Sequence, residues 1–370
     1  FRIEAKQGEA MYVENTAITL SHNELKGSSG FSALKAQDVF GDNHIYKNTF
    51  YGLGSPLLDV ATLKISQDKQ DSSYTIDHNQ IIVLDGQNGL LLDNIQEAKV
   101  LYNEFIGADP LGIALECRAS GVGLLSHQYH YNTIASGFYE AMHVDLSGLE
   151  NQDLSIRDND FASGTLVHGI TYHSDAKQQR LSILNNTVQT LAEGVIIDSS
   201  SIDKSQIEVS DNSFYTYSGS SCMALSSKSS AEIMIASNKI TYSKNLKGNF
   251  SGIVCDLNGE ESELFIKSNT IQMHSSNDGI YVTNEKNANI QIENNEILLK
   301  GDAKGVAIRN QGAGLLLLKL FNNRAVPTFS LSNLAGTFQV EASSQDRLQE
   351  VNSSSSHYIY EGDVSFVEAS

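Results

Sequence analysis

The chain has 370 residues, of which 40% are hydrophobic and 19% charged, so it is long enough and apolar enough to bury a large core. Its formal net charge is −19, from 44 acidic against 25 Lys and Arg residues, and this charge repels phosphate backbones. We therefore expect no nucleic-acid partner, and the lack of any run of 18 apolar residues predicts no membrane span.

The first residues, FRIEAKQGEA, contain no initiating Met and no signal peptide, and the repeat described below begins almost at once. This start predicts a processed chain or a fragment of a larger exported protein. The three cysteines, Cys117, Cys222 and Cys255, occupy apolar positions without metal-binding spacing. We expect free, buried thiols. Few Cys beside many Ser, Asn, Asp and Gly are typical of exported bacterial proteins.

One asparagine recurs along the chain at intervals of 24 to 31 residues, which indicates a repeat architecture. Its positions are Asn23, Asn48, Asn79, Asn103, Asn132, Asn159, Asn186, Asn212, Asn238, Asn269, Asn295 and Asn323. A large apolar residue stands three positions before each Asn, and, except at Ala325, another stands two positions after it. Apolar residues also occur five positions before the Asn, as at Ile207 and Ile290, which gives the period of a strand.

A second short strand follows in most repeats and reads GLLLD at 89, GIALE at 112, AMHVD at 141, GITYH at 169 and GVIID at 194. The same pattern returns as CMALS at 222, GIVCD at 252, GIYVT at 279 and GVAIR at 305. The second and fourth residues are nearly always apolar, as in a strand with one buried face.

These patterns predict an all-β fold in which short strands coil and successive coils pair in parallel, about 4.8 Å apart. A helical solenoid would need a 3.6-residue period, and an antiparallel sandwich would not place its turns at one repeated position. We expect each Asn to adopt φ > 0 at a corner and to hydrogen-bond along a ladder of stacked amides. The alternative is a solvated turn residue without ladder bonds.

The twelve Asn positions predict about twelve coils over residues 1–325. The Asn pattern ends before Pro327, and FQVEASSQDRLQEV and the serine-rich segment after it differ in character. A solenoid end exposes an apolar cross-section, so we interpret residues 326–370 as a C-terminal cap.

The motifs ILNNTV, IASNKI, IKSNTI and IENNEI, each followed by a strand that begins Gly-Ile or Gly-Val, resemble the right-handed parallel β-helix repeats of the pectin-lyase-like superfamily. The resemblance covers about residues 10 to 325. It implies a right-handed coil, and the superfamily includes polysaccharide lyases, galacturonan hydrolases, uronate epimerases, phage tailspikes and bacterial adhesins. The hydrolase motifs NTD, DD, GHG and RIK are absent, YTIDHN at 74 matches a lyase motif only by accident, and ADPLG at 108 lacks the epimerase residues.

The third and fifth residues of the second strand point outward, because the second and fourth point inward. The fifth position reads Asp93, Glu116, Asp145, His173, Asp198, Ser226, Asp256, Thr283 and Arg309. The third position carries His143 and Tyr281. Asp93, Asp198 and Tyr281 are predicted ligand contacts along this face.

Adjacent coils would place Asp93, Glu116 and Asp145 in a row of carboxylates about 5 Å apart. Such a row suits calcium, whereas a carboxylate pair at that distance suits retaining glycoside hydrolysis. His143 or His173 could be the base of a lyase. The candidate catalytic residues are thus Glu116, Asp145, His143 and His173, with calcium at the acidic row as the one candidate cofactor. The alternative is that these are solvated polar residues at strand ends.

Two classes of function follow. The first is a secreted or surface-exposed adhesin-type protein, outside the cell or on a bacterial surface, that binds a carbohydrate or a host-surface protein along its side. The second is a polysaccharide lyase or glycoside hydrolase that uses the acidic and His column. A tailspike, usually a trimer, is a third interpretation, and the sequence gives no oligomeric state.

Overall fold

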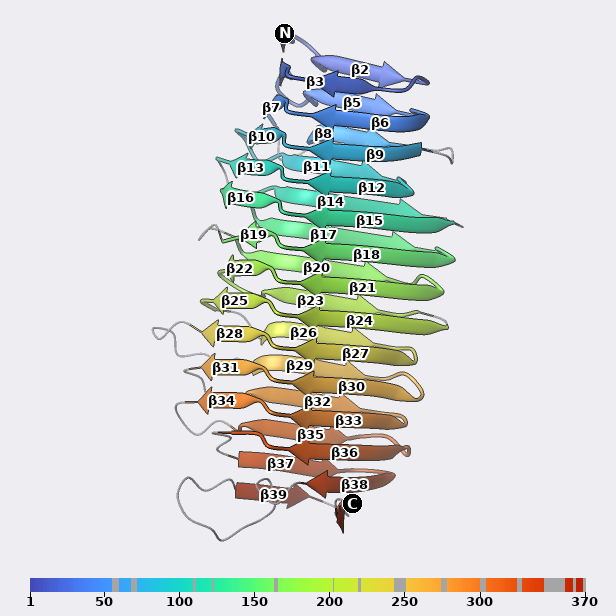
Figure 1. Ribbon diagram of the computed structural model, residues 1–370, viewed down its shortest axis with the longest axis vertical. Coiled ribbons are helices and arrows are strands. Elements are labelled where there is room, and N and C mark those ends of the chain that lie inside the picture. The colour runs from blue at the N-terminus through green and yellow to red at the C-terminus, as the bar shows by residue number, and fades with distance from the viewer. Residues whose placement is uncertain are drawn as a thin grey trace. The chain divides into compact units, whose positions relative to one another are not determined.

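The computed structural model describes residues 1–54, 60–67, 72–108, 111–121, 123–162, 166–201, 203–218, 221–242, 251–273, 278–299, 304–324, 328–342, 357–361 and 364–368. Every regular element in these ranges is a β-strand, and none is a helix. The strands pair in parallel, in three sheets that we call A, B and C (Figure 1). The predicted parallel β-solenoid is therefore confirmed.

The chain divides into two compact units. The first unit contains residues 1–177 and 185–191, and the second contains residues 178–184 and 192–370. Each unit carries strands of all three sheets.

In the first unit, each coil supplies one strand to each sheet. Sheet A contains β1 (Arg2–Glu4), β4 (Glu24–Lys26), β7 (Thr49–Gly52), β10 (Gln80–Val83), β13 (Glu104–Gly107), β16 (Thr133–Ser136), β19 (Asp160–Phe161) and β22 (Thr187–Thr190). Sheet B contains β2 (Met11–Glu14), β5 (Leu34–Gln37), β8 (Ala61–Ser66), β11 (Asn88–Asp93), β14 (Ile113–Ser120), β17 (Glu140–Ser147) and β20 (His168–Ser174). Sheet C contains β3 (Thr19–Ser21), β6 (Gly41–Tyr46), β9 (Ser72–Asp77), β12 (Glu97–Leu101), β15 (Leu124–His130) and β18 (Asn151–Arg157).

The second unit repeats this plan. Its sheet A strands are β25 (Ser213–Thr216), β28 (Lys239–Tyr242), β31 (Thr270–Met273) and β34 (Glu296–Leu299). Its sheet B strands are β23 (Val195–Ser199), β26 (Ser221–Ser227), β29 (Ser251–Leu257), β32 (Ile280–Asn284), β35 (Val306–Asn310), β37 (Thr328–Asn333) and β39 (His357–Glu361). Its sheet C strands are β21 (Gln178–Leu184), β24 (Lys204–Ser210), β27 (Ala231–Ala236), β30 (Ser262–Lys267), β33 (Ala288–Glu293), β36 (Leu315–Phe321), β38 (Thr337–Ala342) and β40 (Val364–Glu368).

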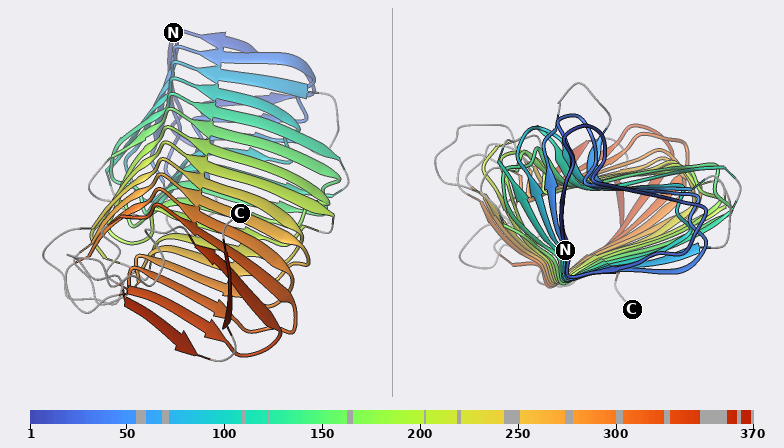
Figure 2. Two further views of the ribbon diagram at one scale, coloured as in Figure 1. Left: turned by 60° about the horizontal axis from the view of Figure 1, so that its bottom comes forward. Right: turned by 90° about the horizontal axis from the view of Figure 1, so that it is seen from above.

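The core of each unit is built from the apolar positions of the repeat. The residue three positions before each ladder Asn is buried throughout, from Leu20 to Leu320, and so is the residue two positions after it, from Leu25 to Ile297. Seen from above, the coils of the first unit run around a common interior (Figure 2). The buried apolar side chains form the core there. Cys117, Cys222 and Cys255 are free and buried, as predicted. Burial raises the pKa of each thiol to about 12, so these thiols stay protonated at neutral pH.

The corner beside the ladder differs from the prediction. The residue with φ > 0 is not the Asn but the residue before it, for example Lys47, Tyr102 and Asp158. The ladder Asn has to keep its amide inside the corner to bond its neighbours, so the sharp turn is made one residue earlier, by a residue whose side chain faces outward. Such a residue needs no particular side chain, only tolerance of the left-handed region.

The C-terminal segment continues the parallel pairing in its described parts. β37 pairs with β35 and β38 with β36, and β39 and β40 then pair with β37 and β38. FQVEA lies in β38, so the strand expected at that place is present. The division at residue 325 and the capping role of residues 326–370 stay predictions.

Candidate functional site

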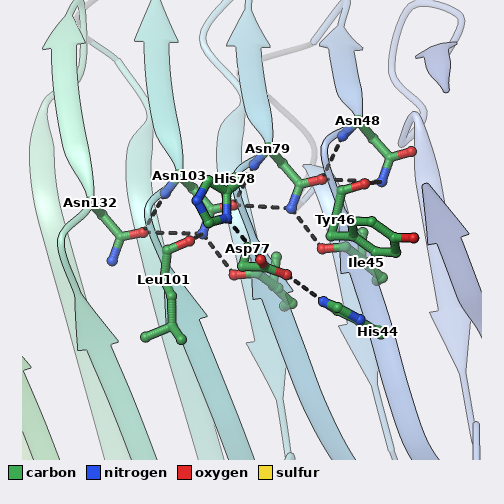
Figure 3. Close-up of polar contacts among 11 residues, drawn as sticks. His44, Ile45, Tyr46, Asn48, Asp77, His78, Asn79, Leu101, Asn103 and Asn132 are labelled. Atoms are coloured by element: carbon green, nitrogen blue, oxygen red, sulfur yellow. Dashed lines mark hydrogen bonds and ion pairs between the residues drawn. The ribbon is translucent and has the colours of Figure 1, made fainter. Parts of the chain in front are cut away.

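The asparagine ladder is present in both units. In the first unit, the backbone N–H and the Nδ2 of Asn103 both donate to Oδ1 of Asn132, at 3.0 and 3.1 Å (Figure 3). Nδ2 of Asn103 also donates to the carbonyl of Ile76 at 2.8 Å. In the second unit Asn238 bonds Asn269 in the same way, at 2.9 and 3.0 Å. The ladder satisfies buried polar groups at every corner, so it is a structural feature and not a binding site.

The predicted acidic row on sheet B is wrong, because the register of β14 differs from the expected one. Asp93 pairs with Arg118, and Arg118 pairs with Asp145. Glu116 pairs with Leu91 on one side and with His143 on the other. Arg118 therefore stands between the two aspartates, in the place that the sequence pattern predicts for Glu116.

The error arose from the segment GIALE, which looks like the other second strands. Leu115 pairs with Leu90, so ALECR, which begins at Ala114, is the segment equivalent to GLLLD. The expected segment therefore begins two residues too early, and hydrophobic alternation cannot detect a shift of two, because the side chains of a strand repeat every two residues.

Glu116 is a buried carboxylate fixed by two partners. Its side chain is 1% exposed. Asn88 Nδ2 donates to Oε2 at 2.5 Å, and Arg118 Nε donates to Oε1 at 2.5 Å, with a second guanidinium nitrogen on the same oxygen. Because the charge is paired and hydrogen-bonded, its burial is tolerated, and the pair holds the Arg118 side chain, itself 40% exposed, in one orientation.

Glu140, a residue that the sequence analysis missed, is the second buried carboxylate of this face. It lies at the start of β17 and is 5% exposed. Its Oε2 is 3.2 Å from Nδ1 of His143, and its Oε1 has no hydrogen-bond partner. The contact with Glu140 raises the pKa of His143, against the opposing effect of burial, and the charges of Glu140, Glu116 and Asp145 add to the rise.

Further polar groups surround these carboxylates. Asp145 pairs with His173 across β17 and β20, and the rings of His143 and His173 are 6.0 Å apart. The hydroxyl of Tyr139 lies 3.2 Å from Nε2 of His168, and Tyr139 is 42% exposed. We call the cluster of Glu116, Arg118, Glu140, His143, Asp145 and His173, carried by β14, β17 and β20, the charged face. It brings together all four predicted catalytic residues.

Calcium at Asp93, Glu116 and Asp145 loses its geometric basis, since these three side chains do not form a row. No group of three His, Cys, Asp or Glu side chains suited to a metal occurs within the described ranges. A calcium requirement stays a prediction.

The remaining predicted ligand contacts lie on sheet B of the second unit. There the expected register is confirmed, because Asp198 pairs with Ser226, Ser226 with Asp256, and Asp256 with Thr283. Asp198 lies 3.9 Å from Nζ of Lys228, and Tyr281 is partly buried on β32. Their role in ligand binding stays a prediction.

A second cluster, which the sequence analysis dismissed as an accidental motif, lies at the ladder corner of the first unit. Asp77 of the YTIDHN segment has Oδ1 2.5 Å from Nε2 of His44 and Oδ2 2.8 Å from Nδ1 of His78 (Figure 3). His78 stacks on Tyr102, and Tyr102 stacks on Tyr131 with 4.7 Å between ring centroids. The sequence shows this row of rings only when the repeats are aligned on the ladder Asn, because each ring belongs to the residue directly before that Asn.

Comparison with known proteins gives no relative, because neither a family model nor a curated protein nor a solved structure matches the chain. Over the described residues there is no helix with the length and hydropathy to cross a membrane.

Proposed function

We propose that this protein binds a carbohydrate at the charged face of its first unit. The observation that carries the proposal is the pair of buried carboxylates, Glu116, which binds Arg118, and Glu140, which contacts His143. Burying a polar group costs stability. Because this surface retains two buried carboxylates, we infer that they are used as hydrogen-bond acceptors in fixed positions.

The chemistry of the face fits sugar hydroxyl groups, each of which both donates and accepts hydrogen bonds. Glu140 and Asp145 supply acceptors, the partly exposed side chain of Arg118 supplies donors, and His143 can supply either. Tyr139, half-exposed beside Glu140, supplies an aromatic surface against which the apolar side of a sugar ring can pack. Held by their neighbours, these groups need little ordering when the ligand binds.

A carbohydrate-active enzyme is the second candidate, and the Glu140–His143 pair favours it. A histidine whose pKa is raised by a neighbouring carboxylate can donate a proton near neutral pH, as hydrolysis or the collapse of a lyase intermediate requires. Assays for new reducing ends and for unsaturated products would reveal such an activity.

We also propose that the chain belongs among the right-handed, pectin lyase-like β-helices and acts outside the cell or on a bacterial surface as an adhesin-type protein. The repeat motifs and the three-sheet coil support the first part, and the acidic, cysteine-poor composition supports the second. A host-surface glycoprotein would be a suitable partner, because its glycan would present the hydroxyl groups that the charged face can bind.

A glycan-array screen tests the proposed function, with wild type beside Tyr139→Ala and His143→Gln. Tyr215→Ala is the matched control, because Tyr215 is a similarly exposed tyrosine of the second unit, at 38% against 42%. We expect the wild type and the control to bind the same glycans and the two first-unit variants to bind at least about tenfold more weakly. Wild type that binds no glycan, or equal binding by all four proteins, would contradict the proposal.

A further inference from the structure

The carboxylate of Glu140 lacks one hydrogen-bond donor. Its Oε2 contacts His143, whereas Oε1 is buried and has no partner. An acceptor in this position costs free energy that a ligand can recover by supplying the donor. Oε1 lies beneath the surface, so a ligand has to displace covering side-chain atoms to reach it, and side-chain rotations of this kind are common on binding.

The charged face is negative around this oxygen. Arg118, the arginine of the charged face, binds Glu116 through two nitrogens. Glu140, Glu116 and Asp145 all act on the imidazole of His143 in the direction that favours its charged form. The whole chain carries a net charge of −19, so the long-range field has the same sign as the local one.

Accepting the carbohydrate site proposed above, we propose that its ligand carries a protonated amino group, as in a 2-amino sugar, which donates to Oε1 of Glu140. An ammonium group provides both the missing donor and the missing positive charge, and hydrogen bonds between ionised groups are about twice as strong as neutral ones. A neutral sugar provides only the donor. A uronate places a carboxylate beside three others and is repelled.

The test is isothermal titration calorimetry with three oligosaccharides of equal length, made of glucosamine, N-acetylglucosamine or galacturonate. The proteins are wild type, Glu140→Gln and the control Glu150→Gln, which neutralises an exposed acid of the same unit that is paired with Lys177. Gln keeps an oxygen acceptor for His143 and removes the charge. Circular dichroism confirms that each variant is folded.

We expect wild type to bind the glucosamine oligomer at least about tenfold more tightly than the acetylated one and to leave galacturonate unbound. Glu140→Gln should lose about tenfold to hundredfold in affinity for the glucosamine oligomer alone, and Glu150→Gln should match wild type.

Binding of the acetylated oligomer as tightly as glucosamine, or a glucosamine affinity that Glu140→Gln leaves unchanged, would overturn this inference while the carbohydrate site stands. If none of the three oligomers binds and no glycan on the array binds either, both the proposed function and this inference are contradicted. If Glu140→Gln does not fold, the preference of wild type between the amino and acetylated oligomers decides the question.

Discussion

Sheet B has the same backbone in both units and a different outer surface in each. In the first unit, the column that contains Glu116 reads Leu91, Glu116, His143 and Thr171. The equivalent column of the second unit reads Ile196, Ala224, Val254, Tyr281 and Ala307. Parallel pairing and core packing are identical in kind, so the backbone does not demand charge at these positions. The charged face is a property of a few side chains placed on a repeated scaffold.

The asparagine ladders, in contrast to the outer surface of sheet B, are alike in the two units. Asn132 accepts two hydrogen bonds from Asn103, and Asn238 accepts two from Asn212, all between 3.0 and 3.1 Å. The ladder bonds that stabilise the coil occur in both units, whereas the residues of the charged face are confined to three strands of the first unit.

The largest expected effect concerns the shared ladder. Asn132→Ala leaves the buried backbone N–H of Asn103 without an acceptor and removes the ladder bonds of both amides, so we expect the free energy of unfolding to fall by about 2–4 kcal/mol, and Asn238→Ala should cost the same within error. Urea denaturation followed by circular dichroism provides the measurement. The exposed Asn151→Ala, as a control, should change stability by less than about 0.5 kcal/mol. A ladder variant that behaves like this control would show that the amide column is dispensable.

The next effect is a stability cost that should differ between the two units. Arg118→Met removes the cation from buried Glu116, and we expect a loss of about 1–3 kcal/mol in the free energy of unfolding. Arg309 occupies the corresponding column of the second unit and is exposed, so Arg309→Met should cost at most about 0.5 kcal/mol. Adding Glu116→Gln to Arg118→Met should restore part of the loss. An equal loss in the free energy of unfolding for Arg118→Met and Arg309→Met would contradict the difference between the outer surfaces of the two units.

The smallest effect is a pH dependence confined to the first unit. The folded-state pKa of His143 lies above the ordinary value of 6.5, first because of its contact with Glu140. Its stabilising contribution is therefore complete below about pH 6.5 and is lost as the pH rises through the folded-state value of the imidazole. Wild type should exceed His143→Gln in stability more at about pH 6 than at about pH 9. A difference that is constant or grows with pH would have the wrong sign.

The sequence was sufficient to predict the coil, because burial is local in a solenoid. An apolar residue three positions before each Asn and another two positions after it fix which side of the strand faces inward, as at Ile292 and Ile297. The ladder bonds can be predicted from the regular recurrence of the Asn alone. The φ > 0 position does not, since any exposed residue can occupy it, as Lys47 and Tyr102 do.

The charged face could be predicted only in part. His143, Asp145 and His173 were placed correctly because their strands share one register. Glu116 was misplaced, because the period of a strand conceals a shift of two residues. Glu140 was missed, since it precedes the five-residue pattern and reads as a loop residue. Contacts such as His44 with Asp77 join residues 33 apart whose approach depends on the length of the intervening coil.

The most direct measurement of the central claim uses the histidines of the protein as reporters. His143 and His173 lie on the charged face, whereas His44 and His78 lie in the corner cluster. NMR spectra of protein labelled only at histidine would be recorded while a glycan from the array is added. Binding at the charged face predicts that the imidazole signals of His143 and His173 shift in a saturable manner while those of His44 and His78 stay in place. Shifts confined to His44 and His78 would contradict the account and place the ligand at the ladder corner.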